Sequence, residues 1–125
     1  MKLNAVLGSL SKMISLIKPL FLILYVALSL FGLYKLKATA FGLSIGYIVG
    51  FLAYASGFGL WLIILKLYPL SVAFPLAAGS LIFGTQIVGV YVLREQFDSA
   101  KIMGVVLILA GIVTLAISDM VGKNE

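Results

Sequence analysis

The chain has 125 residues, of which 63% are hydrophobic and 10% charged, and its formal net charge is +5. Soluble domains contain about a quarter charged residues, so this composition indicates a membrane protein and excludes an ordinary soluble domain. The chain has no cysteine and no histidine, which excludes disulfides, thiolate chemistry and imidazole metal ligands.

Residues 1–18 have the pattern of an amphipathic helix. Plotted at about 100° per residue, the apolar side chains fall in one arc, with Leu16 as the exception. The members of this arc are Leu3, Val6, Leu7, Leu10, Met13, Ile14 and Ile17. Because Pro19 restricts the backbone of Lys18, the helix is predicted to end there. Three interpretations remain open: a lipid-surface anchor, a docking element for a partner, or an extension of the first span into the headgroups.

Four uncharged stretches follow, and each is long enough to cross a bilayer. Their bounds, set by the flanking charges, are residues 19–34, 38–65, 67–93 and 102–118. A spanning helix needs roughly 20 residues, so the middle two can tilt and the outer two are near the lower limit. The predicted fold is all-α, with an interfacial helix over 1–18, a four-helix transmembrane domain over 19–118 and a short polar tail over 119–125.

The four spans contain no Asp, Glu, Lys, Arg or His. Ionisable groups inside a membrane usually mark ion or proton pathways, so coupling through an intramembrane carboxylate is not expected. The sequence also has no phosphate-binding glycine loop, no metal cluster and no nucleophile with a base, so we predict neither catalysis nor a metal or cofactor. The basic residues lie in short connections or at the ends, which indicates lipid headgroup contact and no nucleic-acid partner.

Charge bias gives little preference for one membrane orientation. With the N-terminus inside, the inner segments hold five basic residues and the outer segments hold four. By the positive-inside rule this near balance leaves two interpretations open. The chain has one fixed orientation with a cytoplasmic N-terminus, or it inserts both ways and forms an antiparallel dimer.

Two stripes of small residues predict close helix–helix contacts. In the second span Gly42, Gly46 and Gly50 repeat every four residues, and in the fourth span Gly104 and Gly111 lie a heptad apart. Small residues let neighbouring helix backbones approach closely in lipid. Packing within one chain and packing between two chains are both consistent with this spacing.

Three segments of the chain form a recognisable series: YPLSVAFPLAAG at 68–79, LREQFD at 93–98 and GVVLILAGIV at 104–113. In their order and spacing these segments resemble the small multidrug resistance proteins of the drug/metabolite transporter superfamily. The resemblance implies a four-helix bundle in the bacterial cell inner membrane that works as a homodimer, or as a heterodimer with a similar chain. It further implies that three helices surround a substrate chamber, while the fourth, with Gly104 and Gly111, holds the dimer.

One position departs from the drug-exporting members of that family. They carry a Glu in the first helix about two turns before a Lys near its end, and counting back from Lys35 reaches Ala27. Alanine binds no proton, so proton-coupled export of cationic drugs is disfavoured. Ala73, Phe74 and Pro75 instead resemble an element of the relatives that translocate undecaprenyl-phosphate-linked aminoarabinose, which also lack this Glu.

The neutral polar groups of the spans suit a sugar or a lipid headgroup. Pro75 frees backbone carbonyls, so it is either a tolerated kink or a residue that shapes a chamber. Gln86 makes either an interhelical hydrogen bond or a ligand contact. The candidate chamber residues are Tyr25, Ala27, Tyr54, Phe74, Pro75, Gly79 and Gln86.

Two hypotheses for function follow. The first is a transporter or flippase subunit that moves a lipid-linked sugar or a similar amphiphile between leaflets, with membrane lipid as its ligand. The second is a non-transporting accessory subunit that packs against a larger membrane enzyme. A carrier is expected to leave a polar chamber open to one leaflet, whereas an accessory subunit is expected to be packed solid.

Overall fold

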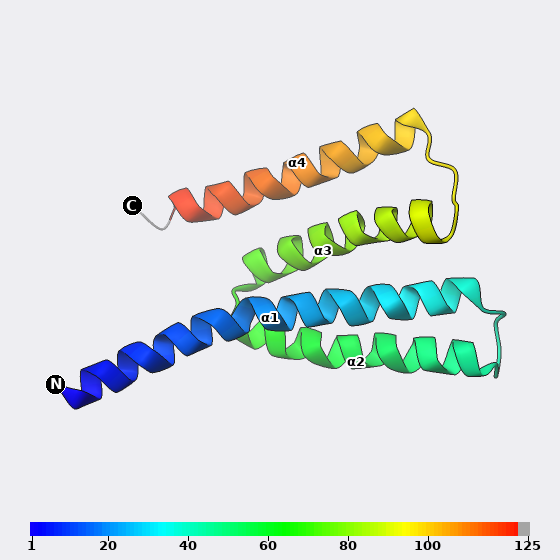
Figure 1. Cartoon of the computed structure of the whole chain (residues 1–125). Coiled ribbons are helices and arrows are strands. Elements are labelled where there is room, and N and C mark those ends of the chain that lie inside the picture. Colours follow the sequence, from blue (N-terminus) through cyan, green and yellow to red (C-terminus); the bar gives the residue numbers. More distant parts are fainter. Residues whose placement is uncertain (123–125) are drawn as a thin grey trace.

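The computed structural model describes residues 1–122, which form four long helices and no β-strand. Successive helices run antiparallel, and the start of α1 and the end of α4 lie at the same end of the molecule (Figure 1). All four helices are long and apolar enough to cross a membrane, which confirms a multi-pass membrane protein. The helices are α1 (Lys2–Ala38), α2 (Ile45–Leu67), α3 (Leu70–Ile87), continued by the π-helical turn η1 (Val88–Val92), and α4 (Ser99–Val121).

Side-chain caps fix two of the helix starts. The hydroxyl of Ser44 accepts a hydrogen bond from the backbone N–H of Tyr47 at 3.3 Å, and α2 begins directly after it. The carboxylate of Asp98 accepts the N–H of Ala100 at the start of α4. Such caps satisfy backbone donors that the helix itself leaves unpaired.

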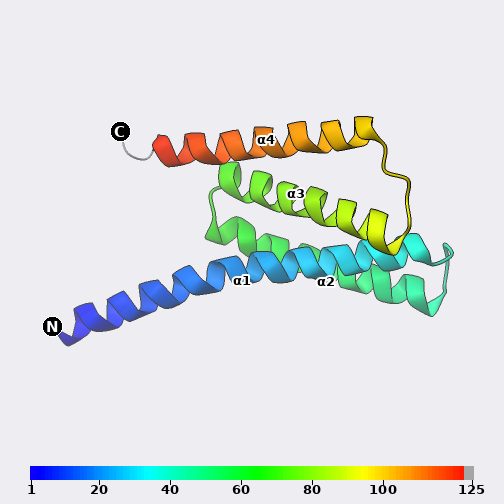
Figure 2. The same ribbon diagram turned by 45° about the horizontal axis from the view of Figure 1, so that its top comes forward.

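The first helix is longer than predicted. No break occurs at Lys18, because α1 runs continuously over 37 residues with Pro19 inside it. Proline removes one backbone hydrogen bond, and the helix continues past this loss. At about 1.5 Å per residue α1 is roughly 55 Å long, well beyond a hydrocarbon core of about 30 Å. Its N-terminal part projects past the other helices in both views (Figures 1 and 2), and each of residues 1–17 is exposed.

Glycines bring α1 and α2 into backbone contact. A Cβ atom on Gly50 would lie 2.7 Å from the Cβ of Lys35 and 3.1 Å from the carbonyl oxygen of Gly32. A Cβ on Gly32 would in turn lie 2.8 Å from the backbone nitrogen of Tyr54. The distances of 2.7 Å and 2.8 Å are shorter than any ordinary contact of a Cβ atom, so only glycine fits at either position without displacing the neighbouring helix.

One member of the predicted glycine stripe is corrected by the structure. Gly42 does not extend the stripe of Gly46 and Gly50, because it lies in the connection before α2, where its φ of +131° is one that glycine adopts readily. At the other end of the chain the fourth candidate membrane span ends at Ser118, and α4 continues to Val121. The rest of the predicted tail, residues 123–125, lies outside the described residues.

The four helices form an open arrangement. α1 packs closely on α2, α3 lies against α1, and α4 packs on α3. Figure 2 shows α3 between α4 on one side and the α1–α2 pair on the other. Gly79 of α3 takes part in the contact with α4, since its Cβ position is 3.2 Å from the side chain of Ile112. Because α3 packs on α1 less extensively than α2 does, the face of α1 beside α3 is left partly open.

Candidate functional site

Two cavities lie along the boundary between α1 and α3. The first, which we call the mid-span cavity, has a volume of about 320 Å³ and is lined by Leu22, Ile23, Val26, Ala27, Leu30 and Ser80. The second, which we call the mouth cavity, has a volume of about 240 Å³ and is lined by Leu30, Leu33, Tyr34, Lys37, Thr85, Val88, Gly89, Leu93 and Glu95. Both are lined by Leu30, so they lie next to each other along α1, and we call the two cavities together the α1/α3 groove.

Leu30 forms the narrow point between the two cavities. Its side chain packs directly against Gly84, a buried residue of α3 without a side chain of its own. On one side of this contact Ala27 and Ser80 face the mid-span cavity. On the other side Val88 and further residues face the mouth cavity. The α1/α3 groove is thus almost entirely apolar at membrane depth.

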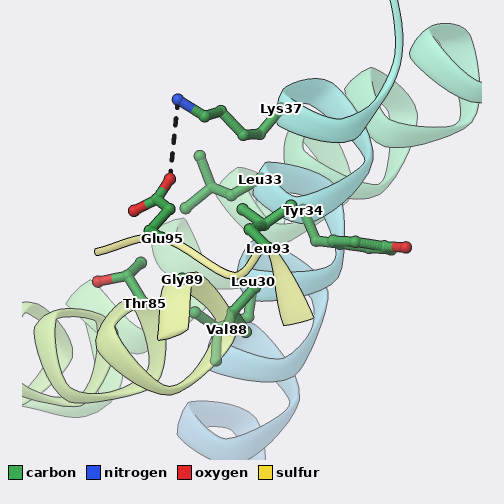
Figure 3. Close-up of a pocket in the computed structure, with 9 residues that line it drawn as sticks. All are labelled: Leu30, Leu33, Tyr34, Lys37, Thr85, Val88, Gly89, Leu93 and Glu95. Carbon is green, nitrogen blue, oxygen red and sulfur yellow. Dashed lines mark ion pairs between the residues drawn. The ribbon is translucent and has the colours of Figure 1, made fainter. Parts of the chain in front are cut away.

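The polar groups of the groove gather at its mouth. The carboxylate of Glu95 lies 3.8 Å from the ammonium of Lys37 at the end of α1 and 3.8 Å from that of Lys101 at the start of α4. Figure 3 shows Lys37 and Glu95 facing each other above the apolar side chains of Leu33 and Leu93. Both nitrogen–oxygen distances are too long for direct hydrogen bonds, and all three side chains are partly exposed.

The backbone after α3 places Glu95 over the mouth. The π-helical turn ends with a bond from the N–H of Leu93 to the carbonyl of Val88, and Arg94 then adopts a left-handed φ of 57°. The chain turns back, so that the N–H of Glu95 donates to the carbonyl of Gly89 at 2.9 Å. A Cβ on Gly89 would lie 3.0 Å from a carboxylate oxygen of Glu95, and glycine at this position therefore leaves room for the acidic group.

Three of the predicted chamber residues lie close together: Tyr25 and Tyr54 between α1 and α2, and Phe74 of α3 beside the ring of Trp61. Tyr25 and Tyr54 line a small cavity of about 50 Å³. The ring of Trp61 in the same cavity lies 5.6 Å from the ring of Tyr25 and 6.3 Å from that of Phe74. These aromatic contacts join α1, α2 and α3 near one end of the spans.

The other four predicted chamber residues lie elsewhere. Ala27 lines the mid-span cavity, on the α3 side of α1. Pro75 lines a separate cavity of about 50 Å³ between α3 and α4, and Gly79 packs against α4. Gln86 is half-buried and lines none of these four cavities. The seven residues therefore do not line one common chamber within this chain.

Sequence reasoning missed the residues at the mouth. From the sequence, Lys37 counts only among the basic residues of the short connections, and Glu95 has no role. One signal was available, because Glu95 is the first acidic residue in the chain. It is therefore the first possible partner for the lysines at the end of the first span.

The glycines of α4 face away from the rest of the chain. A Cβ on Gly104 or Gly111 would have no atom within 4 Å. At about 100° per residue these glycines lie roughly a quarter of a turn from Val105 and Ile112. Of these two, Ile112 faces α3. This side of α4 is thus free to pack against another molecule in the membrane.

The described residues contain no group of three or more acidic, histidine or cysteine side chains that could hold a metal ion. The chain matches no family model, no characterised protein and no solved structure. The class is therefore defined by the fold and the site together: a multi-pass membrane protein of four helices with an apolar groove between α1 and α3.

Proposed function

We propose that the chain is a small multidrug-resistance-like carrier or flippase subunit. It moves a lipid-linked sugar or a similar amphiphile across the bacterial inner membrane. The observation that carries the proposal is the α1/α3 groove, with its apolar length and charged mouth. The resemblance of three segments to the small multidrug resistance proteins supports the same function.

The dimensions of the groove suit a lipid chain. Its lining on α1 runs from Leu22 to Lys37, which corresponds to about 22 Å of helix. The charged mouth lies where α1 and α3 leave the hydrocarbon, and the mid-span cavity lies about three helix turns deeper, toward the bilayer centre. A hydrocarbon chain in the groove would therefore place its headgroup among Lys37, Glu95 and Lys101.

The energy source in this proposal is not an intramembrane carboxylate. No Asp or Glu occurs before Glu95, and Ala27 lines the mid-span cavity with a methyl group. Movement of the amphiphile then follows its own concentration difference between leaflets, or a reaction that consumes it on one side.

A scrambling assay with a blocked groove tests this function. The protein is reconstituted into vesicles that contain NBD-labelled polyprenyl phosphate, and dithionite reports the fraction of label in the outer leaflet. Ser80→Phe fills the mid-span cavity and should abolish scrambling. Ser56→Phe is the matched control, because both serine hydroxyls donate to the carbonyl four residues earlier at 2.8 Å, and Ser56 lies on the exposed side of α2. Equal activity of the two variants would contradict a path through the groove.

The exposed first half of α1 has a place in this proposal as a lipid-surface anchor. Its apolar side chains are open along residues 3–17, and its charges are lysines without any acidic neighbour. A basic amphipathic helix binds anionic headgroups while its apolar face enters the acyl boundary. Pro19 is the position at which this half could turn onto the membrane.

The second candidate function is an accessory subunit without transport. The unoccupied glycine face of α4 favours it, since Gly104 and Gly111 have no neighbour within the chain. The partner in this case is a second copy, a similar four-helix chain or a larger membrane enzyme. Wild-type protein that fails to scramble lipid but copurifies stoichiometrically with one membrane enzyme would favour this function over the first.

A further inference from the structure

We propose that Lys37 and Lys101 form a binding site for the phosphate of an anionic membrane lipid, with Glu95 as the resident group that the phosphate displaces. The two ammonium groups come from different helices and meet one carboxylate at 3.8 Å each. Lys37 and Glu95 line the apolar mouth cavity, and Lys101 joins them through its contact with Glu95. This inference relies on the α1/α3 groove as an amphiphile site. It concerns binding at equilibrium and does not require transport.

The charge of the mouth decides the sign of the ligand. Two ammonium groups and one carboxylate leave a net charge of +1. A cationic headgroup would have to separate Glu95 from both lysines and face them, whereas an anionic headgroup needs only to replace Glu95. A phosphate monoester carries about −1.5 to −2 at pH 7, so it attracts both lysines more strongly than the carboxylate does.

The geometry shows that the carboxylate can be exchanged. At 3.8 Å it makes no direct hydrogen bond to either lysine, and exposed pairs of this kind contribute little to stability. The side chains of Lys37, Lys101 and Glu95 are 68%, 45% and 39% exposed, so each can change its rotamer. A phosphate can accept a charge-assisted hydrogen bond from each ammonium, which the carboxylate does not achieve here.

The cavity below the mouth identifies the source of the phosphate as a lipid. Leu33, Val88 and Leu93 line its walls. The hydroxyl of Thr85 donates its hydrogen bond to the carbonyl of Ile82 at 2.9 Å. A free phosphate ion gains nothing from these apolar walls. An acyl or prenyl chain fills them while its phosphate remains at headgroup depth.

Lipid binding to the purified full chain tests the site. The probe is phosphatidic acid, titrated into protein in a phosphatidylcholine background and counted by native mass spectrometry at fixed salt. Lys37→Gln or Lys101→Gln should weaken binding about five-fold, which corresponds to about 1 kcal/mol for one lysine at the membrane surface. Glu95→Gln should tighten binding by a similar factor, because it removes the competing charge. A gain of affinity also cannot arise from misfolding.

Lys35→Gln is the matched control. Lys35 lies on the same helix turn, but its ammonium sits 5.8 Å from the ring of Phe31 and 5.9 Å from that of Tyr34, and it does not line the mouth cavity. An equal loss of affinity for phosphatidic acid in this variant and in Lys37→Gln would show that the effect comes from general surface charge, and it would overturn the proposal. Weaker binding by Glu95→Gln would overturn it as well, since that result would show that the carboxylate supports the bound lipid and does not compete with it.

Two further readouts separate the possible failures. Inorganic phosphate that displaces phosphatidic acid at equal concentration would contradict a lipid site. Scrambling that fails while the Lys37 and Glu95 variants behave as expected would refute transport alone. Scrambling that succeeds while these variants leave phosphatidic acid binding unchanged would refute the phosphate site alone.

Discussion

Replacing Gly50 by Ala should destabilise the protein, although alanine is the better helix former. Gly50 lies on α2 where the backbones of α1 and α2 touch. The added methyl group would lie 2.7 Å from the Cβ of Lys35, 3.0 Å from the backbone nitrogen of Leu36 and 3.1 Å from the carbonyl oxygen of Gly32. None of these atoms is the end of a flexible side chain, so the helices themselves must separate.

The magnitude follows from two opposing terms. Overpacking against unyielding neighbours costs about 1–3 kcal/mol, and the rigid backbone atoms around Gly50 indicate the upper end. The gain in helix propensity from Gly to Ala returns roughly 0.5–1 kcal/mol. We therefore expect a net loss of about 2 kcal/mol in the free energy of unfolding.

Gly111→Ala is the matched control, since no atom lies within 4 Å of its added Cβ. The propensity term alone then applies, and the unfolding free energy should rise by up to about 1 kcal/mol. Both variants are measured by reversible unfolding in mixed micelles at high dilution, so that contacts between chains do not contribute. Two shifts of the same sign would refute the assignment of Gly50 to the α1–α2 contact and of Gly111 to a free face.

Three other outcomes are expected. Spin labels along residues 3–17 should show a depth profile with helical periodicity, and uniform aqueous exposure would rule out the surface anchor. Transport in vesicles should show no stoichiometric proton antiport, because the spans lack a carboxylate; measured antiport at a fixed ratio would require a coupling residue in a partner chain. Gly111→Leu should reduce crosslinking in native membranes while accumulation stays normal, and crosslinking equal to that of the parent would remove α4 as an oligomer contact.

The membrane fold could be predicted from the sequence because it depends on long-range composition. A spanning helix must be long and apolar, and charged residues such as Lys66 and Lys101 lie at or close to the ends of the uncharged stretches. The length of α1 could not be predicted in the same way. The expectation that the helix ends at Pro19 rests on a backbone preference of the residue before proline. The single hydrogen bond that Pro19 removes is too small a loss to break a helix of 37 residues.

The candidate site was less predictable, because it depends on how the helices are rotated about their own axes. Ala27 and Tyr25 are two positions apart in the sequence, which places them on different sides of α1. They therefore line different cavities, although both appeared suited to one chamber. The pairing of Lys37 with Glu95 also depends on a left-handed turn at Arg94, a non-glycine residue for which no sequence signal exists.

The uneven packing of the helices indicates where the protein can open. α1 and α2 are held by direct contacts around Gly32 and Gly50, and a displacement there would lose many close contacts at once. The boundary between α1 and α3 contains two cavities, whose walls have fewer partner atoms and therefore less to lose on separation. In the membrane, α3 and α4 are thus expected to move together relative to the α1–α2 pair. Such a motion would widen the α1/α3 groove at Leu30, while the exposed ion pair of Lys37 and Glu95 offers little resistance at its mouth.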